Sequence, residues 1–155
     1  MNPLENMDKR AIAYVNIFLL ANKIQTTMDA GMREITTKQW LMLAVLGVFE
    51  SPPNLKQLAS ACGITHQSAK QLLDKLNMKE YVKIQRDNED KRAIRIIPTQ
   101  KYKEWHEKYD ERNQRFIREI FSPLTSEEIE IFLKVQMHLQ KNTAEIVENH
   151  FDDFI

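Results

Sequence analysis

Residues 55–97 read LKQLASACGITHQSAKQLLDKLNMKEYVKIQRDNEDKRAIRII, and this stretch decides the fold. A short helix is expected over 55–62, and Gly63 closes it. Thr65 offers a cap for a second helix, which is expected to run to about Lys79. Two helices joined by a tight glycine turn are typical of a helix-turn-helix, so the stretch predicts this unit.

The hydrophobic period changes after the second helix. Val82 and Ile84 alternate with polar residues, as do Ile94 and Ile96, which is the period of two that β-strands have. The acidic segment 87–90 lies between the two runs. The pattern therefore predicts a two-stranded hairpin with a charged tip, which is a wing beside the helices.

The second helix has one apolar and one polar face. Ala69, Leu72, Leu73 and Leu76 have helical spacing and are expected to be buried. On the open face, glutamine can bond adenine and lysine can reach guanine, and long cations at the wing tip suit phosphates or a minor groove. The candidate DNA-binding residues are His66, Gln67, Ser68, Lys70 and Gln71 on the helix, and Arg86, Asp90, Lys91 and Arg92 on the wing.

The distribution of charge supports a polyanionic partner for this part of the chain. The whole sequence is neutral, with 22 basic and 22 acidic residues, yet residues 55–95 carry nine basic against five acidic side chains. Residues 123–155 carry two basic against seven acidic ones. A basic middle favours contact with nucleic acid, although solvated helix faces also carry charges and the helix pair alone could be only a packing unit.

Two helices are expected before this unit. Apolar spacing predicts one over 7–28, with Gly31 as its C-terminal stop. Hydroxyl caps at Thr36-Thr37 begin the next, which is expected to run to about Phe49. This second helix is apolar almost all round, so it should be buried centrally.

Two more helices are expected after the hairpin. Pro98-Thr99 opens a long helix over 100–121, and Ser122-Pro123 breaks it. Thr125 and Glu128 have the spacing of a capping box for a final helix over 126–148. The expected fold class is therefore mainly α, with a two-stranded β wing.

Several short motifs occur in a familiar order. They are Ile35-Thr36-Thr37-Lys38-Gln39-Trp40 with Leu43 and Leu46, then Leu58-Ala59 with Gly63-Ile64-Thr65, then Leu72-Leu73-Asp74-Lys75-Leu76, then Asp87, Asp90 and Arg92, and finally Pro98-Thr99. Through these motifs, residues 35–105 resemble the MarR family of winged-helix transcriptional regulators. The chain departs from the family at Gln71, where Arg is common, and at Glu80 and Tyr102, where Gly is common. These departures weaken any transfer of an operator sequence.

The resemblance implies a homodimer. In this arrangement, residues 1–34 and 99–155 form the dimerisation helices, and 35–98 form the winged helix-turn-helix domain. The terminal helices carry large apolar residues that one small winged domain could not cover, which agrees with an interface. The alternative is a monomer that packs these helices on its own winged core.

Other chemistry has little support in the sequence. Cys62, the one cysteine, sits where a short helix would bury a small side chain, so a structural role is expected over redox sensing. The histidines are scattered, with only His106 and His138 kept as remote metal candidates, and no catalytic constellation is present. The resemblance implies a small aromatic or phenolic ligand, and Tyr14, Trp40 and Tyr109 are the candidates to line its site.

The combined interpretation is a cytoplasmic, dimeric DNA-binding regulator that is not an enzyme. It is expected to need no cofactor or metal, to bind a pseudo-palindromic operator on double-stranded DNA as a repressor, and to be released by a small ligand. No segment is long and apolar enough to predict a membrane span. The alternative is a winged-helix protein-interaction module that has lost DNA binding, which the neutral charge and Gln71 favour. A helical ligand-binding or enzymatic bundle is a further alternative, with no residue constellation behind it.

Overall fold

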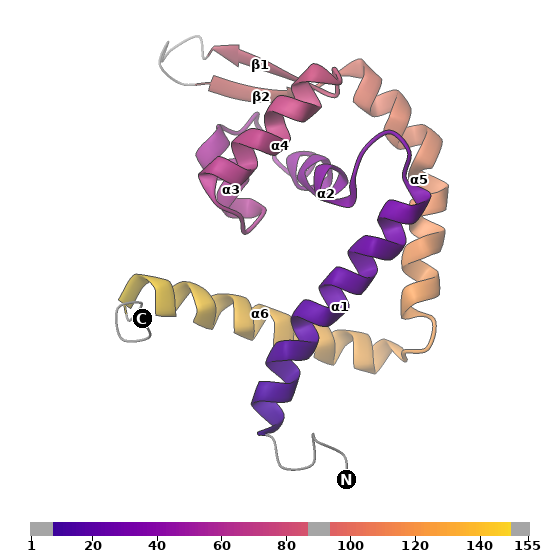
Figure 1. Ribbon diagram of the computed structural model, residues 1–155, viewed down its shortest axis with the longest axis vertical. Helices are drawn as coiled ribbons and strands as arrows, with labels where there is room; N and C mark the ends of the chain where they lie inside the picture. Colours follow the sequence, from indigo (N-terminus) through magenta and orange to yellow (C-terminus); the bar gives the residue numbers. More distant parts are fainter. Residues whose placement is uncertain (1–7, 87–93, 150–155) are drawn as a thin grey trace. The chain divides into compact units, whose positions relative to one another are not determined.

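The computed structural model describes residues 8–86 and 94–149. Their elements follow the order expected from the sequence (Figure 1). The helices are α1 (Lys9–Gly31), α2 (Thr37–Leu46), α3 (Leu55–Ala61), α4 (His66–Met78), α5 (Gln100–Phe121) and α6 (Ser126–Asn149). The strands are β1 (Val82–Arg86) and β2 (Ile94–Pro98).

The chain divides into two compact units, Met1–Trp105 and His106–Ile155. The first contains α1 to α4, the hairpin and the start of α5, and the second contains the rest of α5 and α6. The resemblance divides the chain differently, into dimerisation helices over 1–34 and 99–155 and a winged helix-turn-helix domain over 35–98. This division by function stays a prediction.

Most helices begin at the polar caps that the sequence offers. Thr36 caps α2 and Asn54 caps α3, each in a capping box with the residue three positions later. The Thr65 hydroxyl accepts a hydrogen bond from the Ser68 amide at 3.2 Å at the start of α4. Thr125 and Glu128 bond each other reciprocally before α6, as predicted. These short-range bonds satisfy amides that have no partner inside the helix, which is why local sequence located the starts correctly.

Two helix ends differ from the expectation. Gly31 is the last residue of α1, and the cap is Met32, which has an ordinary φ of −95°. The second helix ends at Leu46 and not at Phe49, because the chain tightens after it. The amide of Val48 donates to the carbonyl of Val45 at 3.1 Å, and that of Phe49 to Leu46 at 3.3 Å. These bonds reach back three residues, so the α-helical pattern of four is lost.

The ends of α3 and α4 share one motif. After α3, the amides of Gly63 and Ile64 donate to the carbonyls of Ser60 and Ala59 at 3.0 and 3.1 Å. After α4, the amides of Glu80 and Tyr81 donate in the same way to Asn77 and Leu76 at 2.9 and 3.0 Å. The motif places Gly63 at φ +65° and Glu80 at φ +62°. Glycine adopts this conformation easily and glutamate does not, so the second cap is strained where the first is not.

The core of the first unit lies among α2, α3, α4 and the hairpin. Leu43, Leu58, Ala69, Leu76 and Ile96 are fully buried there. On α4, Leu72 is only half-buried, which corrects the expectation that the whole apolar set is covered. On α2, Met42, Leu43 and Leu46 are buried but Leu41 is 45% exposed, so the helix is not buried on all sides.

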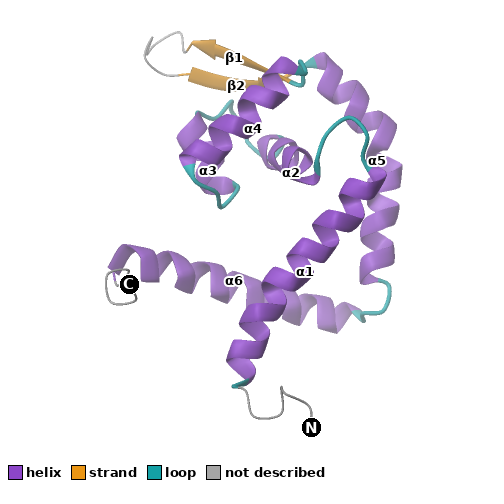
Figure 2. Cartoon of the chain, in the orientation of Figure 1, coloured by secondary structure: helices purple, strands orange, loops and turns teal. Residues whose placement is uncertain are grey.

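The hairpin is antiparallel and pairs Val82 with Pro98 and Arg86 with Ile94. Figure 2 shows these two strands beside α3 and α4. The segment before α3 also binds β2: the Ile96 amide donates to the Pro53 carbonyl at 3.0 Å, and the Arg95 guanidinium to the Pro52 carbonyl at 3.3 Å. The second strand of the wing is therefore fixed to the segment that leads into α3 by one main-chain bond and one side-chain bond.

Candidate nucleic-acid interface

The open face of α4 is the centre of the candidate interface. Ala69, Leu73 and Leu76 are buried against the domain, and each is at most 2% exposed. Because a helix turns about 100° per residue, the opposite side faces solvent. All five candidates on this helix are exposed: His66, Gln67, Ser68, Lys70 and Gln71.

Two of these side chains already have partners on the helix. The Lys70 ammonium lies 3.0 Å from the carboxylate of Asp74, one turn later. Both side chains are more than half exposed, so the pair contributes little to stability. The Ser68 hydroxyl accepts a hydrogen bond from the Thr65 hydroxyl at 3.0 Å. His66, Gln67 and Gln71 complete a polar surface suited to hydrogen bonding with base edges or phosphates.

The wing candidates are only partly covered by the structure. Arg86 is exposed at the end of β1, where it pairs with Ile94. Asp90, Lys91 and Arg92 lie outside the described residues, so their place in the interface stays a prediction.

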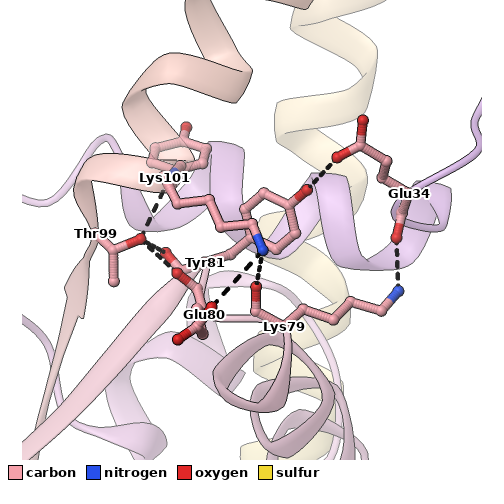
Figure 3. A network of polar contacts seen from close by, with 7 residues as sticks. Glu34, Lys79, Glu80, Tyr81, Thr99 and Lys101 are labelled. Carbon is pink, nitrogen blue, oxygen red and sulfur yellow. Dashed lines mark hydrogen bonds and ion pairs between the residues drawn. The ribbon is translucent and has the colours of Figure 1, made fainter.

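A polar network at the base of α4 was not predicted from the sequence (Figure 3). The Lys79 ammonium donates to the Glu34 carbonyl at 2.6 Å and to the Gln39 side chain at 3.2 Å. The Tyr81 hydroxyl donates to the Glu34 carboxylate at 2.7 Å. On the other side, the Lys101 ammonium donates to the Lys79 carbonyl at 2.8 Å. The network thus links the segment before α2 to the end of α4, the start of β1 and the start of α5.

The three candidates for a ligand site occupy different elements. Tyr14, on α1, is 65% exposed and makes an edge contact with Phe18 at 5.1 Å between ring centroids. Trp40, on α2, is half-buried. Tyr109 belongs to the second unit, where the cations of Lys108 and Arg112 lie 5.0 and 4.6 Å from its ring centre. A shared cleft for the three rings stays a prediction.

The remaining candidates show no reactive setting. Cys62 caps the end of α3 and is half-buried, and burial raises the pKa of its thiol. A raised pKa disfavours the thiolate, which is the reactive form. His106 and His138 are exposed. Within 8–86 and 94–149, no group of three or more His, Cys, Asp or Glu side chains could hold a metal ion. No helix in the described part of the chain has the length and apolar character that a bilayer crossing requires.

Comparison with known proteins identifies the same part of the chain. The family model described as the MarR family matches residues 34–93. This match contains the capped start of α2, the helix-turn-helix and β1.

Solved structures share the fold over nearly the whole chain. A MarR/EmrR family transcriptional regulator from Acinetobacter sp. ADP1 superposes with a TM-score of 0.80 at 18% identity, covering 90% of this chain and 99% of its own. An organohalide-sensing transcriptional regulator in its 2,4-dichlorophenol-bound form gives 0.83 at 17%, covering 97% and 90%. FabT from Streptococcus pneumoniae, in complex with DNA, gives 0.68 at 18%, covering 90% and 99%. At these identities the likeness shows a common fold.

Proposed function

We propose that this chain is a MarR-family regulator, because the family model matches its winged-helix domain. On this premise it is a dimeric repressor that binds a pseudo-palindromic operator. The family consists of transcriptional regulators and not of enzymes. A repressor of this kind acts on the chromosome, so we expect it in the cytoplasm.

The observation that carries the proposal is the open face of α4. Five polar side chains are exposed there on a helix whose other side is anchored in the core. A recognition helix needs both properties, because base edges are read in the major groove by side chains whose helix cannot shift. Gln67, Lys70 and Gln71 are proposed to discriminate bases. Lys91 is proposed to contact phosphate, and Arg92 a narrow minor groove, where the negative potential favours cations.

The terminal helices support dimerisation. On α1, six large apolar side chains between Tyr14 and Leu20 are 48–65% exposed. On α6, Ile131, Leu133 and Met137 are more than half exposed. Apolar surface of this extent is normally covered by a partner. Two copies of the winged domain would then meet two half-sites, which is why the operator is proposed to be pseudo-palindromic.

A small aromatic or phenolic ligand is the proposed releasing signal. The relative solved with 2,4-dichlorophenol supports this ligand class. Tyr14, Trp40 and Tyr109 remain the candidate lining residues. Adding phenols to a protein–DNA complex should lower its DNA affinity, and Trp40→Phe should remove any accompanying quenching of tryptophan fluorescence.

The decisive experiment is a mobility-shift assay with DNA from upstream of the protein's own operon and with a scrambled duplex of equal length. Preferential retardation of the upstream duplex supports the proposal. Equal, weak binding to both duplexes at moderate salt refutes sequence-specific recognition. The competing function, a winged-helix interaction module, is favoured by the neutral charge and by the Lys70–Asp74 pair, and it predicts no retardation of either duplex.

A further inference from the structure

The segment between α1 and α2 is bonded on both sides. On the α1 side, the Asp29 carboxylate accepts hydrogen bonds from the Thr37 amide at 2.6 Å and from its hydroxyl at 2.7 Å. On the other side, Glu34 accepts from Lys79 and Tyr81 (Figure 3). Polar contacts at both ends of this segment therefore connect it to α1 and to Lys79 and Tyr81, which follow α4.

Tyr81 is held firmly enough to fix the start of β1 relative to the segment before α2. Its side chain is only 2% exposed, and its ring makes an edge contact with Trp105 at 6.1 Å between centroids. The Lys101 ammonium lies 5.2 Å from the centre of the same ring. Close packing restricts where this side chain can lie, and its hydroxyl donates to the Glu34 carboxylate.

Gln39 strengthens the same junction. It is buried, at 2% exposure, and its side-chain oxygen accepts from both the Thr36 amide and the Lys79 ammonium. One oxygen therefore caps α2 and holds the end of α4. Buried polar groups that are fully paired specify one arrangement, because any other arrangement leaves a partner unsatisfied.

We propose that Glu34 and Tyr81 are a positioning pair, which sets the orientation of the recognition helix and wing relative to α1 and so determines how well the protein discriminates its operator from other DNA. This inference rests on the proposed function. The pair does not touch DNA. It acts through Lys79 and the strained turn at Glu80, which lie between the recognition helix and β1.

The test uses the full-length protein, a duplex that the parent protein selects from a random-sequence pool, and a scrambled duplex. Tyr81→Phe and Glu34→Ala should each weaken binding to the selected duplex about three- to tenfold, the loss expected for one net hydrogen bond. Binding to the scrambled duplex and the salt slope should stay unchanged, because phosphate contacts are not involved. Glu34→Gln keeps an acceptor oxygen and should retain most of the discrimination. The double variant Glu34→Ala with Tyr81→Phe should lose no more than either single variant.

Tyr102→Phe is the matched control. Tyr102 is a buried tyrosine of the same unit whose hydroxyl lies 3.5 Å from the Leu43 carbonyl. Loss of the Tyr102 hydroxyl should lower the urea midpoint, as the loss of a structural hydrogen bond does. It should leave unchanged the ratio of the affinities for the selected and the scrambled duplex. If Tyr81→Phe and Glu34→Ala behave like this control, the inference is wrong although the proposed function stands. A parent protein that selects no duplex refutes the proposed function, and the inference with it.

Discussion

The cap of α4 predicts that a glycine at position 80 stabilises the protein. Glu80 has a φ of +62°, and a side chain in this region costs about 1–2 kcal/mol. Glycine avoids that cost but loses about 0.5–1 kcal/mol through its freedom in the unfolded chain. Glu80→Gly should therefore raise the free energy of unfolding by roughly 0.5–1 kcal/mol.

The control separates backbone strain from charge. The Glu80 carboxylate lies 4.0 Å from the Lys101 ammonium, and both groups are largely exposed. Glu80→Ala removes this weak pair but keeps the strained φ, so the stability difference between Glu80→Ala and Glu80→Gly isolates the backbone. Gly63→Ala is the converse: an added methyl group meets nothing within 4 Å, so only the backbone is affected. The cost of the positive φ, about 1–2 kcal/mol, is partly offset by the lower freedom of alanine in the unfolded chain, about 0.5–1 kcal/mol, and the expected net loss is roughly 0.5–1 kcal/mol.

The assay is urea unfolding at one fixed protein concentration, followed by tryptophan fluorescence. A fixed concentration matters because the stability of the proposed dimer would depend on it. If Glu80→Gly is no more stable than Glu80→Ala, and Gly63→Ala matches the parent, positive φ carries no measurable cost in this protein and the reasoning fails.

Four other predictions concern binding, assembly and pH. Gln67→Ala should cost about 1–3 kcal/mol on a selected duplex and little on scrambled DNA in fluorescence anisotropy, and an equal loss on both would place the reading face elsewhere. Arg92→Ala should reduce affinity for the selected duplex at least tenfold, about 1.4 kcal/mol, with an unchanged urea midpoint; parental affinity at moderate salt would contradict the proposed wing contact. Deleting 125–155 should give a monomeric or insoluble product by sedimentation, and a soluble dimer that still binds DNA would exclude the proposed interface. The hydrogen bonds from Thr37 lower the pKa of Asp29 in the folded protein. The ionised Asp29 therefore stabilises the fold fully above the unfolded carboxyl pKa of about 3.9, and this contribution disappears as pH falls through the lower folded value. The urea midpoint of Asp29→Asn should converge with that of the parent only at acid pH.

Local chemistry made much of the fold predictable. Thr36, Asn54 and Thr65 cap helices through bonds that reach three residues along the chain, so their roles can be read from the sequence. The end of α3 is equally local, because the Gly63 amide donates to the Ser60 carbonyl three residues earlier. The end of α2 was missed because the three-residue bonds after Leu46 depend on how the following segment tightens, and apolar residues there resemble more helix.

The candidate site was predictable only where one helix defines it. The exposed set on α4 follows from the spacing of Ala69, Leu73 and Leu76. The Glu34–Tyr81 bond joins residues 47 positions apart, and nothing in either local segment indicates the other. Such bonds arise from the packing of α2 against α4, which sequence periodicity does not report.

The Lys70–Asp74 ion pair on α4 affects how DNA binding would depend on ionic strength. In the proposed complex, Lys70 would approach DNA with its charge already balanced by Asp74, so the two side chains together would bring almost no net charge to the phosphates. A contact of this kind displaces few condensed cations from the duplex and depends little on salt. A lysine or arginine that contacts phosphate without an acidic neighbour behaves in the opposite way, because it displaces more of these cations. Rising salt would therefore remove general attraction first and leave sequence discrimination by the helix, so selectivity should improve as total affinity falls.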